Sequence, residues 1–264
     1  MPGSPMVGEM LRSWRQRRRL SQLDLACQAN ISTRHVSFLE TGRSRPSREM
    51  LLRLAEQLEI PLRARNALLL AAGFAPEYPE RSLDDPAVAA GRRAVELVLQ
   101  AHEPYPAIAV DRHWNLAASN AAIGPFLAGV PEQLLAPPAN VLRLSLHPEG
   151  LAGRIVNLAQ WRHHLLHRLR QQVEATADPV LMELATELER YPAGPPNGPE
   201  SEGDGGYAGV AIPFRIRVDG GVMSFLSTTT IFGTPVDITL AELAIESFFP
   251  ADEATAAALM RPRT

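Results

Sequence analysis

Five side chains between residues 33 and 41 repeat at helical spacing and could recognise the edges of DNA bases. They offer a guanidinium group, hydroxyl groups and an aromatic ring, and they are Thr33, Arg34, Ser37, Phe38 and Thr41. Four of them share the helix face opposite the apolar one, and the first stands at the exposed N-terminal end. Arginine can donate two hydrogen bonds to one guanine, hydroxyls donate or accept, and a ring can contact a thymine methyl group. The pattern predicts base reading in the major groove, with packing of Phe38 against a neighbouring helix or a partner as the alternative.

Three further side chains are predicted to contact phosphate groups. Gln22 stands at the start of the preceding helix, and Arg43 and Arg45 lie in the loop that follows the base-reading face. Such donors position a protein on the DNA backbone without reading sequence. Part of the arginine run at 17–19 could act in the same way, and a merely solvated surface explains that run equally well.

Residues 22–41 predict the two helices that would position these groups. Ala26 is small enough for a close helix crossing, and apolar residues at helical spacing surround it. These apolar residues are Leu25, Ala29, Ile31, Val36 and Leu39. Asn30 falls at the turn, where a left-handed backbone is needed and asparagine is the next best residue after glycine. Ser32 is placed to cap the second helix, which completes a helix-turn-helix pattern.

Further helical periodicity surrounds this pair. Helices are expected over residues 7–19, from the capping residue Ser47 to 58, and over 62–72, where Gly73 ends the last one. The five helices predict an all-α DNA-binding domain at residues 1–75.

The distribution of charge agrees with this division. Residues 1–75 contain 12 Arg and 6 Asp or Glu, a net charge of +6, whereas the remainder contains 14 Arg and 23 acidic residues, a net charge of −9. A basic domain attracts DNA phosphates, and an acidic one is repelled by them. The acidic part is therefore expected to do something other than bind DNA.

Several classes of protein are excluded by composition. All 26 basic residues are arginine, so the lysine that a P-loop, a Schiff-base enzyme or a protein kinase requires is missing. Cys27 is the only cysteine, which excludes disulfides within the chain and cysteine-based zinc fingers, and it is expected to lie in the core. No apolar run could span a bilayer and no signal peptide is evident, so the protein is expected to be cytoplasmic, without a membrane partner.

The remaining sequence predicts an α+β domain. Residues 76–101 are expected to form a linker and a connecting helix, and residues 102–264 a domain with an antiparallel sheet and helices on one side. Strands are expected as a hairpin over 107–118, as a second hairpin that begins at Val210, and from about 239 to 249.

The turn at residues 219–221 would place Met223 and Phe225 on the same side of the second hairpin as Ile216 and Val218. Helices are expected over 157–175 and 179–190. The segment 191–206 is rich in glycine and proline and predicts a mobile loop.

Apolar side chains on the inner faces of this domain could line a ligand pocket. They are Trp114, Trp161, Phe214, Ile216, Phe225 and Leu243. An apolar or amphipathic small molecule, with an acyl chain as one example, is the ligand class that such a surface predicts. Simple filling of the core is the alternative for each residue.

Metal binding and catalysis have little support. His163 and His167 stand four apart on an expected helix, a spacing able to hold zinc, but no third ligand follows at a fitting offset. Solvent-facing histidines are the expected interpretation. The sequence contains no nucleophile elbow, glycine-rich phosphate loop or recognisable carboxylate pair, so no cofactor and no enzyme activity are expected.

The N-terminal part resembles the xenobiotic-response-element (XRE, Cro/C1-type) family of bacterial DNA-binding domains over roughly residues 7–72, with Asn30 where glycine is common. The whole chain resembles the MmyB-like branch of that family. This resemblance is carried by Phe-Leu-Glu-Thr-Gly-Arg-Ser-Arg-Pro-Ser at 38–47, Asp-Arg-His-Trp-Asn-Leu at 111–116 and Ile-Phe-Gly-Thr-Pro-Val-Asp-Ile-Thr-Leu-Ala-Glu-Leu at 231–243.

The resemblance implies a transcriptional regulator with a PAS-like C-terminal ligand-binding domain, the sheet of which curls around a pocket. It also implies that Glu40 pairs inward with Arg15 and does not read bases. Residues 130–206 match only loosely, so the identity of the ligand is not implied.

The sequence therefore predicts a one-component, homodimeric regulator that binds a two-fold operator in double-stranded DNA. Its acidic domain would adjust that binding through a small apolar or amphipathic ligand, a fatty acid being one candidate. One alternative is a non-sensing DNA-binding protein whose C-terminal domain only dimerises or recruits a protein partner. Another is an enzyme with an appended DNA-binding domain.

Overall fold

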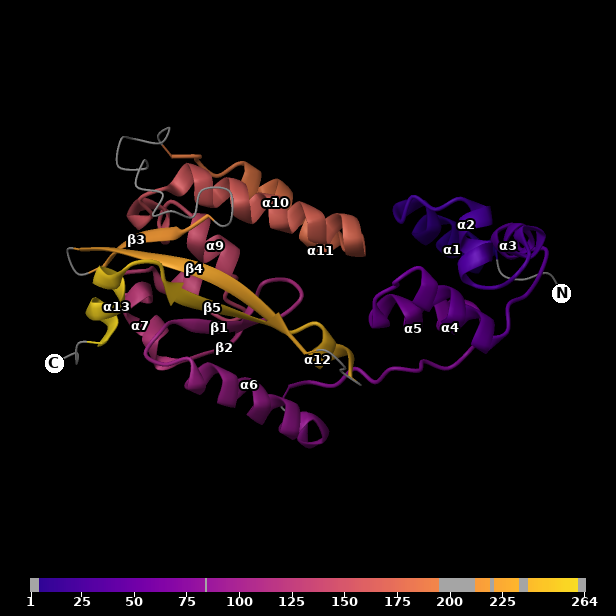
Figure 1. Ribbon diagram of the computed structural model, residues 1–264, viewed down its shortest axis with the longest axis horizontal. Coiled ribbons are helices and arrows are strands. Elements are labelled where there is room, and N and C mark those ends of the chain that lie inside the picture. The colour runs from indigo at the N-terminus through magenta and orange to yellow at the C-terminus, as the bar shows by residue number, and fades with distance from the viewer. Residues whose placement is uncertain (1–4, 84, 195–211, 219–220, 233–236, 261–264) are drawn as a thin grey trace. The chain divides into compact units, whose positions relative to one another are not determined.

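The computed structural model describes residues 5–83, 85–194, 212–218, 221–232 and 237–260. These residues form two compact units (Figure 1). The first takes in the chain up to Arg81 and a later segment that ends at Ala241, and the second takes in the rest. Within the described ranges, no helix is long and apolar enough to cross a membrane.

Five helices of the first unit enclose one apolar core. They are α1 (Pro5–Arg17), α2 (Gln22–Gln28), α3 (Thr33–Glu40), α4 (Arg48–Gln57) and α5 (Leu62–Ala71). Buried side chains recur every three or four residues, as Val7, Leu11 and Trp14 do in α1, because one stripe of each helix faces the core. The predicted all-α part of the fold is confirmed.

The turn between α2 and α3 has the predicted conformation. Asn30 is left-handed, with φ of 52°, and the Ser32 hydroxyl accepts a hydrogen bond from the His35 N–H at 3.2 Å. Ser47 caps α4 in the same way, and Gly73 follows α5 with φ of 84°. Ser21 forms a capping box with Asp24 at the start of α2 and further defines where that helix begins.

Cys27 is exposed, so its predicted place in the core is wrong. The inward face of α2 is formed by Leu25 and Ala26, followed by Ala29. A residue one position after Ala26 points about 100° away from it and therefore out to solvent.

Residues 237–241, far along the chain from the five helices, also belong to the first unit. The Ile238 N–H donates to the Pro79 carbonyl at 2.9 Å, and the Thr239 hydroxyl donates to the Arg81 carbonyl at 2.6 Å. The sequence predicted a strand from about 239, but the backbone forms the short helix α12 (Ile238–Ala241). Asp237 caps this helix by accepting from the Thr239 N–H at 2.9 Å, which explains the difference.

A five-stranded antiparallel sheet forms the centre of the second unit. Its strands are β1 (Ala107–Val110), β2 (Leu116–Ser119), β3 (Phe214–Val218), β4 (Gly221–Ile231) and β5 (Ala244–Pro250). Their order is β2-β1-β5-β4-β3, so β5 joins the two hairpins. The predicted α+β class with an antiparallel sheet is confirmed.

The second hairpin places Met223 and Phe225 on the predicted side. Ile216 lies opposite Met223, and Phe214 lies opposite Phe225, so their side chains share one face. All four are buried in one apolar cluster of this unit. The expected strand start at Val210, the turn at 219–220 and most of the loop predicted at 191–206 lie outside the described residues.

Helices cover both faces of the sheet, whereas helices on one side only were predicted (Figure 1). Helices α9 (Val141–Leu146), α10 (Leu158–Thr176) and α11 (Pro179–Glu189) lie over one face. Helix α6 (Ala89–Ala101), predicted as a connecting helix, packs against β1 on the other face. All four residues of β1 are consequently buried. Both faces of the strands are therefore covered. The alternation of apolar and polar side chains along a strand does not show which face lines which part of the core.

Shorter elements complete the second unit. They are η1 (Pro86–Val88), η2 (Ala121–Ile123), α7 (Gly124–Leu127), α8 (Glu132–Leu135), η3 (Ala152–Arg154) and α13 (Glu253–Met260).

Candidate DNA-binding face and ligand cavity

Helix α3 has one buried face and one outward face. Val36, Leu39 and Glu40 are buried against the core. The residues predicted to read bases lie on the outward side, where Arg34 and Thr41 are exposed and the other three are half-buried. Because Ser32 caps the helix, the first helical turn presents Thr33 and Arg34 at the end that enters a major groove in this motif.

The ring of Phe38 lies beside two guanidinium groups. The Cζ atom of Arg34 is 5.1 Å and that of Arg43 is 6.0 Å from the ring centroid. The Arg43 N–H donates to the Phe38 carbonyl at 2.8 Å, which holds the following loop against the end of α3. Phe38 is not a member of the apolar core of this unit. Cation–π contacts of this kind favour particular orientations of both arginine side chains.

Two of the predicted DNA-contacting residues already have intramolecular hydrogen bonds. The Thr41 hydroxyl donates to the Ser37 carbonyl at 2.7 Å, which leaves its oxygen as an acceptor for a base. The side-chain amide of Gln22 donates to the Glu40 carboxylate at 2.9 Å. One amide hydrogen of Gln22 then remains for a phosphate. Arg43 and Arg45, the other two residues predicted to contact phosphates, are exposed in the loop after α3.

Glu40 and Arg15 form the inward pair that the family resemblance implied. Nε of Arg15 lies 2.6 Å from one carboxylate oxygen of Glu40, and a second guanidinium nitrogen lies 2.9 Å from the other. Burial raises the pKa of Glu40, but the hydrogen bonds from Arg15 and Gln22 outweigh it, so that the pKa is lowered overall. The same hydrogen bonding raises the pKa of Arg15. The pair links α1 to α3 and holds α3 in a fixed position against α1.

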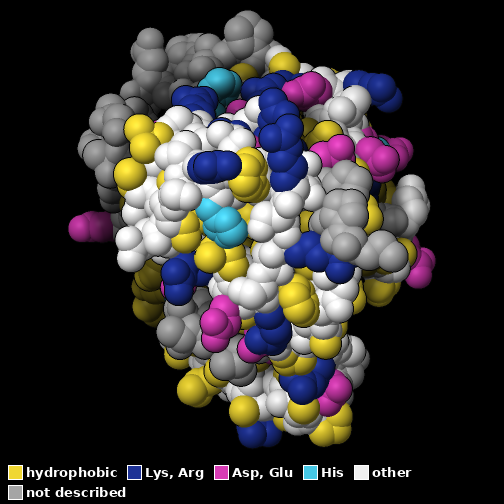
Figure 2. Space-filling view, turned by 90° about the vertical axis from the view of Figure 1, so that its right-hand side faces the viewer, with side chains coloured by type: hydrophobic (Ala, Val, Ile, Leu, Met, Phe, Trp, Pro, Cys, Tyr) yellow, Lys and Arg dark blue, Asp and Glu magenta, His cyan; other side chains and the backbone are white. Residues whose placement is uncertain are grey.

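On the face drawn in Figure 2, positive charge is spread out rather than gathered into one patch. In the view of Figure 2, arginine side chains stand singly or in small groups among uncharged and hydrophobic ones. Single arginines of this kind can each contact a phosphate group.

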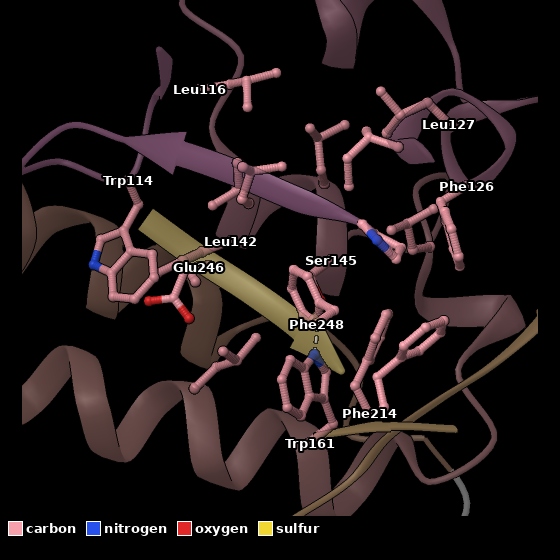
Figure 3. A pocket seen from close by; sticks show the side chains of 18 of the residues that line it. Trp114, Leu116, Phe126, Leu127, Leu142, Ser145, Trp161, Phe214, Glu246 and Phe248 are labelled. Atoms are coloured by element: carbon pink, nitrogen blue, oxygen red, sulfur yellow. Dashed lines mark hydrogen bonds between the residues drawn. The ribbon is translucent and has the colours of Figure 1, made fainter. Parts of the chain in front are cut away.

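The second unit contains a cavity of about 110 Å³ between the sheet and the helices that cover it (Figure 3). A single water needs roughly 10–15 Å³ on this scale, so the cavity has room for an organic molecule. Apart from Ser145, Arg168 and Glu246, the described residues that line it are apolar. Apolar cavities with a few convergent polar groups are typical binding sites for small molecules.

Four of the six residues predicted to line a pocket do so, namely Trp114, Trp161, Phe214 and Phe225. Ile216 is fully buried in the same apolar cluster but does not reach the cavity.

Leu243, the sixth of these residues, does not line the main cavity. It lines a different cavity with Val95 of α6 and Ala109 of β1. Glu246 and Phe248 of β5 face the main cavity. Successive side chains of a strand point to opposite faces of the sheet, so Ile245 points to the side of α6. Leu243 was predicted to face the pocket because it is apolar. Leu243 and Ile245 lie instead on the side of α6, because helices cover both faces of the sheet.

A hydrogen-bonded turn places Trp114 in the cavity wall. Asp111 accepts hydrogen bonds from the backbone N–H of His113 at 2.8 Å and of Asn115 at 2.9 Å. Asn140 donates to the His113 carbonyl at 2.8 Å from outside the turn. Trp114 adopts φ of 66°, a left-handed conformation that is rare for a large side chain. The polar residues at 111–116 therefore serve to hold an aromatic side chain in a strained position.

Glu246 of β5 lies at the Trp114 end of the cavity (Figure 3). There it forms an ion pair with Arg168 of α10. Two guanidinium nitrogens of Arg168 lie 2.7 and 3.2 Å from the two carboxylate oxygens of Glu246. The Arg168 Cζ atom is 4.9 Å from the centroid of the Trp114 ring. Sequence reasoning missed both charged residues. Helical spacing could have found Arg168, which lies seven residues after Trp161 on the same face of α10.

An aromatic wall closes another side of the cavity. The indole N–H of Trp161 donates to the Ser145 hydroxyl at 3.0 Å, and its ring lies 4.8 Å from that of Phe214. His164 stacks on Trp161 at 5.3 Å between ring centroids. Burial, followed by the nearby positive charge of Arg168, lowers the pKa of His164. This imidazole is therefore neutral near pH 7 and packs as an aromatic group.

Both the unit that contains α3 and the unit that contains the cavity match known protein families. Residues 92–261 match the family described as the MmyB-like transcription regulator ligand binding domain, which covers more than half of the chain. The chain belongs to the MmyB-like transcription regulators. Residues 11–64 match the helix-turn-helix family and contain α2 and α3. The described residues that line the main cavity all fall inside the ligand-binding match. Among curated proteins, none matches the chain.

The regulator is thus a DNA-binding protein with a ligand-binding domain, and both families are those of regulators rather than enzymes.

His163 and His167 lie with parallel rings and centroids 6.5 Å apart on α10. Across the described parts of the chain, no three histidine, cysteine or acidic side chains are grouped so that they could hold a metal ion.

Proposed function

We propose that this regulator is a homodimer that binds a two-fold DNA operator and that a small molecule in the second unit changes its affinity for DNA. The ligand is apolar or amphipathic, with a fatty acid as one candidate. Thr33, Arg34, Ser37, Phe38 and Thr41 read bases, whereas Gln22, Arg43 and Arg45 contact phosphates.

The cavity is the single observation that carries the sensing part of this proposal. It is large enough for an organic guest and is walled almost wholly by apolar side chains. A cavity of this size costs a protein packing energy unless something fills it, since lining atoms lose their contacts. A domain that served only as a dimerisation scaffold would have no need to keep it.

The DNA-binding part is supported by the geometry of α3. The outward residues are hydrogen-bonding or cationic, with one ring held beside arginines, while the buried face is tied to α1 by the Arg15–Glu40 pair. The described part of one chain has one such helix, and regulators of this motif bind two half-sites as symmetric dimers.

Native mass spectrometry followed by solvent extraction tests the sensing part directly. We expect the purified protein to retain an organic adduct or to bind members of a panel of fatty acids, acyl esters and aromatic metabolites. A ligand present at 100 times its Kd should stabilise the protein by about 2.7 kcal/mol, which raises its melting temperature.

The same panel should also change operator affinity, because a ligand shifts an equilibrium only through unequal affinity for two states. The typical size of such a coupling is about 1–3 kcal/mol. If nothing is extracted and no compound alters melting temperature or operator affinity, the ligand-binding domain acts without a ligand of this class. The function of the C-terminal domain would then be dimerisation or recruitment of a protein partner.

A further inference from the structure

The wall of the main cavity carries one positive and one negative side chain, and they neutralise each other. Of the described residues that line it, only Arg168 and Glu246 are charged. Glu246 is almost fully buried, and the side chain of Arg168 is 23% exposed. Figure 3 shows Glu246 and Trp114 at one end of the cavity, with Phe126 and Phe214 toward the other. The cavity therefore has a polar end and an apolar end.

A third residue joins the ion pair on the solvent side. Thr229 of β4 is exposed, and its hydroxyl donates to Glu246 at 2.8 Å. The same hydroxyl oxygen accepts from Arg168 at 2.8 Å. These bonds use three of the five N–H donors of Arg168 and about three of the four lone-pair sites on the Glu246 carboxylate. Both a donor group and an acceptor site remain for a ligand.

The charge of this end decides which ligand head group it favours. A carboxylate that accepted hydrogen bonds from Arg168 would stand beside the negative charge of Glu246, in surroundings where charges are poorly screened. An ammonium group bound to Glu246 would stand beside Arg168 for the same reason. An uncharged group that both donates and accepts can bond to both partners without such repulsion.

We infer that the ligand is an uncharged amphiphile, in which an alcohol or amide group binds between Arg168 and Glu246 and a hydrocarbon part fills the apolar end. Glu246 is the residue that discriminates against carboxylates. This inference rests on the proposed ligand-binding function and narrows it, because a fatty acid anion becomes a poor ligand.

A series of probes with one chain length tests the inference on the unaltered protein. 1-Decanol, decanamide, decanoate and decylammonium share a hydrocarbon chain and differ in the charge of the head group. Trp114 and Trp161 line the cavity, so tryptophan emission reports binding. At pH 8 we expect the alcohol and the amide to bind about tenfold more tightly, or better, than either ion, since like charges in a poorly screened site strongly oppose binding.

Glu246→Gln then changes the charge and keeps the shape of the side chain. Arg168 would lose its counter-ion, and the affinity for decanoate should rise about tenfold while that for decanol changes little. Glu187→Gln is the matched control, because Glu187 forms a similar two-bonded pair with Arg143, at 2.8 and 2.7 Å, away from the cavity. It should leave the order of the four affinities unchanged.

The outcomes separate this inference from the proposed function. Decanoate binding to the unaltered protein as tightly as decanol would overturn the inference and leave the proposed function standing. A Glu246→Gln variant in which both affinities shift equally would show that Glu246 does not discriminate. If none of the four probes changes tryptophan emission or melting temperature, the proposed ligand-binding function itself fails for acyl-type molecules.

Discussion

The guanidinium group of Arg34 lies over the ring of Phe38, with its Cζ atom 5.1 Å from the ring centroid, on the outward face of α3. The two residues are one helical turn apart, so the helix itself sets their distance. The ring restricts the arginine and so lowers the entropy that Arg34 loses when it binds a base. Arg43 lies at 6.0 Å from the same ring but belongs to the loop after the helix.

This difference predicts distinct effects of the two arginines on DNA binding. Arg34→Ala should weaken binding to the operator by about 1–3 kcal/mol and relax the preference at one base pair, because a two-bonded contact to guanine is lost. Arg43→Ala should weaken binding to all sequences alike and reduce the salt slope by about 1. Titrations of operator and random DNA at several salt concentrations measure both effects. Arg53→Ala, which removes an exposed arginine from α4, is the control. Equal weakening of both DNAs by Arg34→Ala would contradict the assignment.

The buried Arg15–Glu40 pair predicts a large effect on stability. Arg15→Ala should destabilise the first unit by about 3–5 kcal/mol, because it leaves a buried carboxylate without its partner. Urea unfolding followed by Trp14 emission reports on this unit when Trp114 and Trp161 are replaced by phenylalanine. Gln16→Ala shortens an exposed side chain of the same helix and should change stability by no more than about 0.5 kcal/mol. Similar losses from both variants would mean that the pair contributes little.

Acid should weaken the first unit through Glu40. Its pKa is lower in the folded protein than the ordinary value of 4.5, so the folded state holds this proton less well than the unfolded state. The stabilisation is therefore present above pH 4.5 and is lost as pH falls through the folded-state pKa. Unfolding free energies measured between pH 3 and 6 should fall more steeply with acid in the unaltered protein than in Glu40→Gln. Parallel pH profiles would show that Glu40 is not responsible.

A larger side chain in the cavity should abolish the response to ligand. Phe214 lines the cavity and contacts Trp161, so Phe214→Trp would occupy space that the ligand needs. Phe249→Trp makes the same change on β5 at a side chain that is exposed and outside the cavity. Ligand-induced changes in melting temperature and operator affinity should disappear in the first variant and persist in the second. A full response in Phe214→Trp would place the ligand elsewhere.

The proposed dimer predicts a symmetric footprint. Two recognition helices related by a two-fold axis should protect inverted half-sites whose centres lie about 10 base pairs apart, or a multiple of that spacing. Footprinting at saturating protein concentration tests this geometry. Protection of a single asymmetric half-site would contradict the homodimer.

Much of the first unit could be predicted from sequence because its determinants are local. Asn30 and Ser32 impose a turn and a helix start within a few residues, and Ala26 permits close packing of neighbouring helices. The outward face of α3 follows from helical periodicity alone. In the second unit the hairpin register of Phe214 with Phe225 was predictable for the same reason, since a short turn sets which residues lie opposite each other.

The polar end of the cavity was decided only by tertiary structure. Arg168 and Glu246 are 78 residues apart and come together because α10 lies across the face of β5 that carries Glu246. The sequence at residues 243–248 defines two faces, with Leu243 and Ile245 on one and Glu246 and Phe248 on the other, but not which helix covers each. Helix α6 covers the face of Leu243 and Ile245, and α10 covers the face of Glu246 and Phe248. Contacts between elements far apart in the chain depend on how the whole domain packs, so local periodicity does not show which helix covers which face.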